Sequence, residues 1–407
     1  MLNLRHLHVF CEVARGRSIS AAARAVHLTQ PAVTQAVAGV ERFFGAALLD
    51  RSSSGVSLTT AGTACVERME RALDQLREGI AELNRGAQRG GRAGGSELER
   101  FMTTSQLRAL VSVVERQSFT LAARSLGVAL PTIHRAARAV ERAAGVALFE
   151  RTSFGVRPTS EAEKLARRVS LAFAEIAQAR AELDALRGGD TGRTVIGTMP
   201  LARSYLVPKA LIAFTAEHPG HGVSILEGLY DDLLSALRSG GADFLIGALR
   251  RQLPYDDVVQ EHLFDDPLAI IMRSGHPLAR RRKPAAELLT RYPWIAPRPE
   301  TPLRAQFDAL FAGAGLEAPR SPIECNSLVA ARALLLESDR LMLLSAHQIH
   351  YELEAGLLKA LPHPAGNVVR PIGITVRRGW RPTTVQQRLL EQIRLQARNA
   401  AATSLAR

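Results

Sequence analysis

The chain has 407 residues, 46% of them hydrophobic, and a formal net charge of +13. This length allows several domains, and without any run of about eighteen apolar residues a membrane-spanning helix is excluded. Charges interrupt the apolar part of the amino terminus, and no cleavage site follows it, so it is not a secretory signal. Cys11, Cys65 and Cys325 are far apart and match no disulfide or metal-binding spacing. We therefore expect a reducing, cytoplasmic environment and no cofactor.

The positive charge favours an acidic partner, and nucleic acid is the first candidate. Residues 1–190 carry a net charge of +7 and the remaining residues carry +6. Because the charge is spread along the chain, it permits DNA binding without locating it.

The sequence contains an internal repeat with a spacing of 100 residues. The segment "LTQPAVTQA" at 28–36 corresponds to "VALPTIHRA" at 128–136. The flanking residues keep the same frame, since "VER" occurs at both 40–42 and 140–142. The chain therefore carries the same structural element twice, with altered central residues in the second copy.

Each copy predicts a winged helix-turn-helix. A helical spacing of apolar residues comes first, and Ser18 or Ser20 is placed to cap the next helix. After a short break, a third helix begins at Gln30 and Pro31, where proline is tolerated because its missing N–H has no intrahelical partner. Turn residues and a short alternation then predict a β-hairpin. We expect the two domains at 1–62 and 104–162, with their helix-turn-helix elements at about 19–38 and 119–138.

A long helix with a coiled-coil seam follows each winged helix. The seam residues, which recur in steps of three and four, are Val66, Met69, Leu73, Leu76, Ile80 and Leu83, and then Leu165, Val169, Ala172, Ile176, Ala179, Leu183 and Leu186. We expect linker helices at 63–87 and 163–188, and a glycine- and arginine-rich flexible linker at 88–103. Each seam either pairs with another helix or packs on its own domain, and the unbroken steps favour pairing.

Residues 191–400 have a different pattern, in which short apolar segments alternate with helical stretches. The strand candidates are "TVIGTM", "VSILEG", "ADFLIGAL", "LAIIM", "PWIAP", "LMLL" and "IGITV". The helical stretches include Leu206–Glu217, Asp232–Ser239 and Leu328–Glu337. Such alternation predicts an α/β fold with a mostly parallel sheet.

The motif "LTQPAVTQAV...VERFFGAALLDRSSSGVSLTTAG" closely resembles the amino-terminal domain of LysR-type transcriptional regulators. "VIGTMPLARSYLVPKALIAFTAEHPG" resembles the start of the effector-binding domain of that family. The resemblance implies an α/β multidomain chain in which two winged helix-turn-helix domains precede a two-subdomain effector domain like the periplasmic binding proteins. Subdomain I would be 191–271 plus 370–400 and subdomain II 272–369, with hinges near Ile271–Arg273 and Val369–Ile372. The departure from the family pattern is the second winged helix, because family members normally carry one.

The first recognition helix carries amides suited to base reading. Exposed residues in its first turns reach base edges. Gln30, Thr34 and Gln35 face away from the apolar face, and glutamine bonds bidentately to adenine while threonine meets thymine or a phosphate. The family resemblance points to Gln30, Pro31 and Thr34. The alternative is that Gln30 and Thr34 only cap and solvate the helix.

The two predicted hairpins begin with Arg51 and Arg151. Both are candidates for phosphate contacts. For Arg51, a structural ion pair with Glu41 is an equally open interpretation.

In the second copy the glutamine becomes Leu130, and Thr132, His134, Arg135 and Arg138 take the following positions. Arg135 and Arg138 lie one turn apart and suit phosphates, or a guanine in the case of Arg135. This copy therefore binds DNA with a different preference, holds the backbone alone, or is kept for packing or dimerisation. Some DNA contact is favoured.

Two segments predict the effector site. The candidate contacts are Thr198, Met199, Arg203 and Ser204 after the first strand, and Asn326 and Ser327 at the start of a later helix. Hydroxyl, guanidinium and helix N–H groups at such a strand end could hold a small anion. By resemblance, family members bind small metabolites, often carboxylates, between the two subdomains. Ser327 as a plain helix cap and Arg203 as a solvated surface residue are equally open.

Together these features predict a cytoplasmic, sequence-specific transcriptional regulator that binds double-stranded DNA, is controlled by a small-molecule effector, and assembles through its linker helices as a dimer or tetramer. Two other classes compete with it, a nonspecific architectural DNA-binding protein and an α/β ligand-binding or enzymatic domain with a DNA-binding appendage. No nucleophile, phosphate-loop or dinucleotide motif supports the enzyme. His347 and His350 lack a carboxylate partner at a recognised metal spacing.

Overall fold

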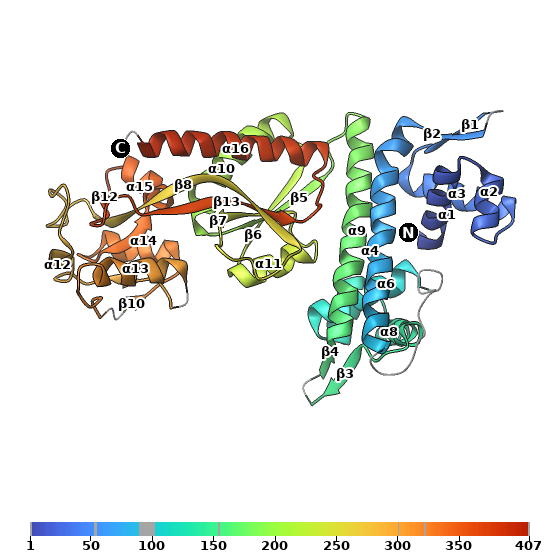
Figure 1. Cartoon of the computed structure of the whole chain (residues 1–407), viewed down its shortest axis with the longest axis horizontal. Helices are drawn as coiled ribbons and strands as arrows, with labels where there is room; N and C mark the ends of the chain where they lie inside the picture. Colours follow the sequence, from blue (N-terminus) through green and yellow to red (C-terminus); the bar gives the residue numbers. More distant parts are fainter. Residues whose placement is uncertain are drawn as a thin grey trace. The chain divides into compact units, whose positions relative to one another are not determined.

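The computed structural model describes residues 2–52, 55–88, 102–153, 155–299, 301–320 and 323–405. The chain forms two compact units, one made chiefly of residues 1–193 and the other chiefly of residues 194–407 (Figure 1). Within the described ranges no helix combines the length and the apolar character needed to cross a membrane.

The first unit contains both predicted winged helix-turn-helix domains. The first has α1 (Leu4–Gly16), α2 (Ile19–Ala25), α3 (Gln30–Phe44), β1 (Leu49–Ser52) and β2 (Gly55–Leu58). The second has α6 (Thr104–Arg116), α7 (Phe119–Leu126), α8 (Leu130–Ala144), β3 (Phe149–Thr152) and β4 (Gly155–Pro158). Both hairpins are antiparallel. Ser18, rather than Ser20, is the cap of α2, because its side chain accepts a hydrogen bond from the backbone N–H of Ala21.

A glutamate late in each third helix fixes the start of the hairpin. The Glu41 carboxylate accepts hydrogen bonds from the backbone N–H groups of Leu48 and Leu49 at 2.8 and 3.2 Å. Glu141 does the same for Leu148 and Phe149 at 3.0 and 3.2 Å. The "VER" element found in both copies thus holds each wing against its recognition helix.

The linker helices α4 (Thr60–Gln88) and α9 (Ser160–Leu186) pack against each other within the chain, side by side in Figure 1. The prediction that the seams pair with another helix is therefore confirmed. Most seam residues are buried, including Met69, Leu76, Val169 and Ala179. Val66 and Ile80 are half-buried, and Leu186 is 53% exposed at the last turn of α9. One continuous apolar core joins this pair to the first winged helix and to part of the second.

The second unit is built on a sheet with the strand order β11-β8-β13-β7-β5-β6, and β12 also pairs with β8. Its strands are β5 (Arg193–Thr198), β6 (Gly222–Glu227), β7 (Phe244–Ala248), β8 (Val258–Arg273), β9 (Ile295–Ala296), β10 (Ile323–Glu324), β11 (Met342–Ser345), β12 (Leu358–Pro362) and β13 (Val369–Arg377). The helices are η1 (Ala202–Leu206), α10 (Val207–Glu217), α11 (Tyr230–Arg238), α12 (Ala286–Leu289), α13 (Pro302–Ala312), α14 (Leu328–Leu336), η2 (Ala346–Ile349), α15 (His350–Glu354) and α16 (Thr384–Leu405).

Strand β8 connects two lobes. Its first part pairs with β13, and its last residues pair with β11 and β12. Each lobe has apolar cores of its own, around Phe214, Phe244 and Ile374 in one, and around Trp294, Phe307 and Phe311 in the other. This arrangement is the two-lobed α/β fold expected of an effector domain.

The expectation of a mostly parallel sheet is wrong at β8 and β13. The β5–β7 and β9–β10 pairings are parallel, but β13 runs antiparallel to both β7 and β8. The physical reason is the connectivity. The chain leaves the first lobe along β8 and returns to it along β13, so these neighbouring strands run in opposite directions.

Candidate DNA interface and effector cavity

The first recognition helix presents a polar face above a buried apolar one. Gln30, Pro31 and Gln35 are exposed and Thr34 is half-buried, while Val33 is fully buried. The cap of the helix is Thr29, whose hydroxyl accepts from the N–H of Ala32 at 3.4 Å. The amides of Gln30 and Gln35 are therefore not the helix cap and lie at the surface.

Arg51 is exposed on the first hairpin. Its proposed structural partner, Glu41, directs one carboxylate oxygen to the backbone of the hairpin instead. This geometry favours the phosphate-contact interpretation of Arg51. Arg151 occupies the corresponding place on β3, but its side chain lies outside the described residues.

The second recognition helix has a different surface. Thr132, Arg135 and Arg138 are exposed on α8. His134 is exposed too, and its ring stacks on that of Phe119 with the ring centroids 4.3 Å apart. Leu130 is 38% exposed where the first copy has a glutamine. This helix therefore offers cationic and apolar groups rather than amides.

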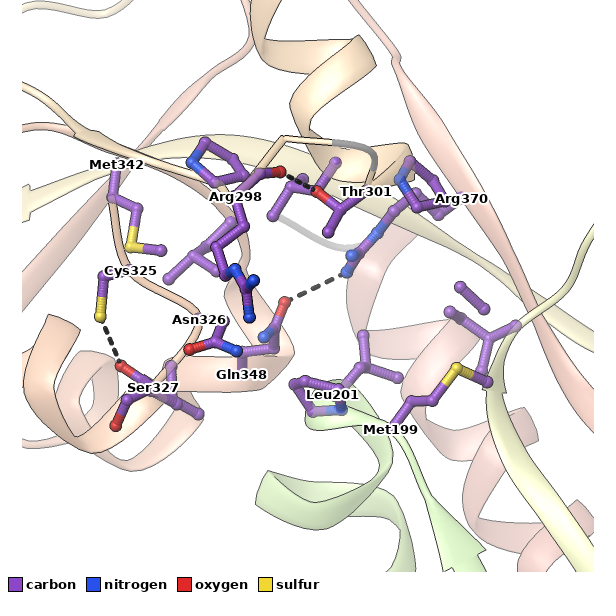
Figure 2. A pocket seen from close by; sticks show the side chains of 18 of the residues that line it. Met199, Leu201, Arg298, Thr301, Cys325, Asn326, Ser327, Met342, Gln348 and Arg370 are labelled. Atoms are coloured by element: carbon purple, nitrogen blue, oxygen red, sulfur yellow. Dashed lines mark hydrogen bonds between the residues drawn. The ribbon is translucent and has the colours of Figure 1, made fainter. Parts of the chain in front are cut away.

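The second unit contains a cavity of about 200 Å³ between its two lobes (Figure 2). Its wall is mainly apolar, and the polar side chains that line it include Arg250, Arg298, Thr301, Asn326, Ser327, Gln348 and Arg370. Ligand pockets commonly enclose about 300–1,000 Å³. The volume of this cavity lies below that range, so it suits only a small, metabolite-sized molecule.

A buried polar cluster lies behind this cavity. Asp266, on β8, is fully buried and accepts hydrogen bonds from Ser345 at 2.5 Å, His347 at 2.8 Å and Arg370 at 2.9 Å. Arg370 also donates to the side chain of Gln348 at 3.2 Å, the contact drawn in Figure 2. Arg370 and Asp266 face each other across β13 and β8, so the cavity is joined by hydrogen bonds to the strands that connect the lobes.

Of the predicted effector residues, the structure brings Met199, Asn326 and Ser327 to the cavity. Ser327 also caps α14, since its hydroxyl accepts from the N–H of Ala330 at 3.3 Å. The two interpretations of Ser327 are thus compatible. Cys325 lies beside them and donates to the Ser327 carbonyl at 3.3 Å.

Thr198, Arg203 and Ser204 are not among the cavity-lining residues. Thr198 is buried and donates to the Leu226 carbonyl at 3.4 Å. Arg203 pairs with Glu227 at 2.6 Å, and Ser204 donates to the carbonyl of Pro200 at 3.2 Å. Thr198 ends β5, and Arg203 and Ser204 lie in η1, so these three residues lie in the elements on either side of Met199.

The polar residues that sequence reasoning did not find are Arg250, Arg298, Thr301, Gln348 and Arg370. Arg298 follows the predicted strand "PWIAP", and Arg370 lies in the predicted hinge Val369–Ile372. A search for polar residues directly after predicted strands and in the predicted hinges would have found Arg298 and Arg370. His347, considered as a metal ligand, instead contacts Asp266, and the described residues contain no group of three or more metal-binding side chains.

Comparison with known families accounts for both units. The model of the "Bacterial regulatory helix-turn-helix protein, lysR family" matches residues 4–63 and again residues 104–163. The model of the "LysR substrate binding domain" matches residues 187–398. The chain belongs to the LysR family. As a LysR-family protein it is a DNA-binding transcriptional regulator with an effector-binding carboxyl-terminal domain.

Curated LysR-type relatives support this assignment. The regulator GalR of Pseudomonas putida is 33% identical over 93% of both chains. The regulator PcaQ of Agrobacterium fabrum is 29% identical over 93% of its own length but only 71% of this chain. These relatives are transcriptional regulators, not enzymes, which confirms the preference for a regulator over an enzyme with a DNA-binding appendage.

Solved structures show the same LysR fold. Full-length OxyR from Pseudomonas aeruginosa has a TM-score of 0.55 at 24% identity and covers 73% of this chain and 95% of its own. CbnR has a TM-score of 0.52 at 22% identity, covering 73% of this chain and 99% of its own. A further match, with a TM-score of 0.51, is full-length CbnR complexed with its target DNA.

Proposed function

We propose that the first recognition helix reads operator bases and that the cavity of the second unit binds a small organic anion. The observation that carries the DNA part is the exposure of Gln30 and Gln35 on a helix whose opposite face is buried and whose cap is a different residue, Thr29. Their amides suit adenine, and the neighbouring Thr34 suits a thymine methyl or a phosphate.

Positioning on the duplex comes from the flanking groups. Pro31 fixes the first turn of α3, and Arg51 on the hairpin contacts phosphate. In the second copy the contact set is Thr132, His134, Arg135, Arg138 and Arg151.

The anion assignment rests on the cation content of the cavity. Arg250, Arg298 and Arg370 line it. The Nε of Arg370 is buried and has no hydrogen-bond partner among the described residues. Asn326 and the amino terminus of α14 add hydrogen-bond donors at the same wall. An apolar body with one carboxylate fits both the apolar wall and these donors, while Thr198, Arg203 and Ser204 contribute through the position of Met199.

Effector binding then acts on DNA through the lobes. A carboxylate that engages Arg370 changes the hydrogen bonding of Asp266 on β8, and this changes the angle between the two lobes.

We place this regulator in the cytoplasm. Self-association as a dimer or tetramer remains part of the proposal, but the seams of α4 and α9 are already buried against each other. Further chains would therefore join through other surfaces.

The DNA assignment is tested by selecting bound sequences from a random duplex pool. Gln30→Ala with Thr34→Ala should abolish operator selection while the helical ellipticity stays that of the parent. The salt dependence of binding separates base reading from phosphate contact. A protein that reads bases keeps its affinity for the selected operator at salt concentrations that abolish its binding to random duplexes. Unchanged selection by the double variant removes α3 from the role of base reader.

The effector assignment is tested by titrating a panel of small carboxylates and their neutral amides. Arg298→Gln should weaken binding of the best carboxylate at least tenfold and leave the amide unaffected. Arg388→Gln, an exposed change on α16, is the matched control. The same titration with Arg203→Gln decides between the cavity and the preceding loop, since a tenfold loss there with none at Arg298 would move the site to the loop.

A further inference from the structure

The two linker helices of one chain are related by an approximate two-fold axis. Cys65 donates from Sγ to the Ala179 carbonyl at 3.4 Å. The corresponding residues 100 positions away, Leu165 and Gly79, also meet, since a Cβ built on Gly79 would lie 3.2 Å from Leu165 Cδ1. Such reciprocity requires antiparallel helices, and it puts the axis near residues 72 and 172, which are both fully buried alanines.

The polar contacts that Arg68 and Arg168 make across the pair obey the same symmetry. Arg68 donates to Glu175, Gln178 and Glu182, and Arg168 donates to Gln75, Glu78 and Glu82. Every one of these residues corresponds to its counterpart by the 100-residue spacing. An interface in which residue i contacts j and j contacts i is the kind that two copies of a chain form in a symmetric dimer. Here one chain supplies both surfaces.

We propose that a single chain is a complete two-headed DNA-binding unit that recognises one bipartite operator made of two unlike half-sites. Each winged helix packs on the helix pair, through α1 on α4 and through α6 on α9. The first is also held by Arg187, the residue that caps the end of α9, which donates to the Gly45 carbonyl at 2.5 Å. A second chain is therefore not needed to bring two recognition helices together.

The half-sites differ because the recognition helices differ chemically. The first presents Gln30 and Gln35, which select adenine. The second presents Leu130, which is 38% exposed, beside the exposed Arg135. Apolar side chains at this place contact thymine methyl groups, and arginine pairs with guanine or with phosphate. The second half-site should be selected for thymine methyls and guanine rather than for adenine.

The inference rests on the proposed function of α3. It adds a second recognition helix that contacts bases, and a fixed spacing between the two half-sites. Because both heads are held on one helix pair, the second contact occurs at a high effective concentration. Because the heads are fixed relative to each other, the two half-sites must keep one rotational position about the axis of the duplex. Inserting five base pairs between the half-sites turns one by about half of a 10–10.5 base-pair turn, which places it on the opposite face of the duplex.

The experiment begins with the operator that the intact full-length chain selects from a random duplex pool. Dissociation constants are then measured for Gln30→Ala with Thr34→Ala and for Arg135→Ala with Arg138→Ala. Each double variant should bind at least tenfold more weakly and lose selectivity in one half only. A five-base-pair insertion should cost the parent at least tenfold. Arg388→Ala with Arg398→Ala, in α16 of the second unit, controls for the loss of two positive charges.

A complementation test distinguishes pairing within a chain from pairing between chains. The two double variants are produced together in one cell, so that any exchange of α4 and α9 between chains forms operator-binding units with two intact heads. We expect the mixture to bind no more tightly than the better variant alone. Recovery of parent-like affinity would show pairing between chains and overturn the proposal.

Two further outcomes are separable. An operator that is lost with Gln30 and Thr34 but insensitive to Arg135 and Arg138 overturns the second reader and leaves the proposed function of α3 intact. No enrichment of any sequence by the intact chain defeats the proposed function itself. Equal ellipticity of all variants at 222 nm ensures that a loss of affinity is not a loss of fold.

Discussion

Replacing Arg68 by alanine should destabilise the first unit by about 3–5 kcal/mol, the usual cost of removing one partner from a buried ion pair. The Arg68 side chain is 8% exposed, and its partners Glu175 and Glu182 are 11% and 18% exposed. Removal leaves carboxylates in an interface that excludes water. Because Glu175 keeps a second partner, Arg71 at 2.8 Å, we expect the lower end of this range.

The variant at the symmetry-related position, Arg168→Ala, gives a second free energy of unfolding with which to compare that of Arg68→Ala. Arg168 is 19% exposed, and one of its partners, Glu78, is 54% exposed. Water can therefore solvate what its loss leaves behind, and Arg168→Ala should cost about 1–3 kcal/mol. The exposed pair of Arg77 and Asp74, whose side chains are 39% and 59% exposed, is the control. Arg77→Ala should cost no more than about 1 kcal/mol.

The chain allows the two units to be followed separately. Its two tryptophans, Trp294 and Trp380, and all five of its tyrosines lie in the second unit. Tryptophan emission thus reports the second unit, while far-UV ellipticity also reports the helices of the first. In urea, Arg68→Ala should lower the midpoint of the first-unit ellipticity transition by about 1–3 M, given slopes of about 1–3 kcal/mol/M, and leave the emission transition in place. A loss no larger than that of Arg77→Ala would refute the buried helix pair.

Two more predictions concern titratable groups. Burial raises the pKa of the Cys11 and Cys65 thiols to about 12 in each case, whereas Cys325 is partly exposed at the cavity. At pH 8 a thiol reagent should therefore modify Cys325 quickly, and all three cysteines only after denaturation. A ligand bound in the cavity should slow the reaction of Cys325. A hydrogen bond from Arg394 lowers the pKa of Glu261, so this pair stabilises the second unit fully above the ordinary glutamate pKa of about 4.3 and loses that stabilisation as the pH falls through the lowered value. Arg394→Gln should therefore reduce stability at pH 7 more than at pH 3 in urea titrations followed by tryptophan emission, and an equal loss at both would contradict the assignment.

The fold of each winged helix could be predicted because its signals are local. Ser18, Pro31 and the glycines at the helix ends are read within a few residues of their effect. The same is true of the two seams, whose spacing favours another helix as the partner. The spacing does not specify which helix, since any apolar stripe of the right period satisfies it. The pairing of α4 with α9 depends on Arg68, Arg168 and their acceptors, which only the folded chain brings together.

The residues of the cavity could be predicted only in part, because some of them depend on contacts between segments far apart in the sequence. Met199, Asn326 and Ser327 could be found because they lie at the end of a predicted strand or at the start of a helix. Arg370 could not, because its role depends on facing Asp266 across two strands that are about one hundred residues apart in sequence, with β13 antiparallel to its neighbours. Sequence patterns give the order of strands along the chain, but not their order in the sheet.

The duplication itself has a physical consequence that a dimer of identical chains does not share. In such a dimer both recognition helices come from the same residues, so any change alters both half-sites at once. In this chain several linker residues about the two-fold axis are identical in the two copies, with Arg68 matched by Arg168, Ala72 by Ala172 and Glu82 by Glu182. The recognition positions do not correspond, since Gln30 is replaced by Leu130 and Gln35 by Arg135. The contacts of the two matched arginines thus occupy equivalent positions in both copies, while the proposed base-reading positions differ, as the proposed operator of two unlike halves requires.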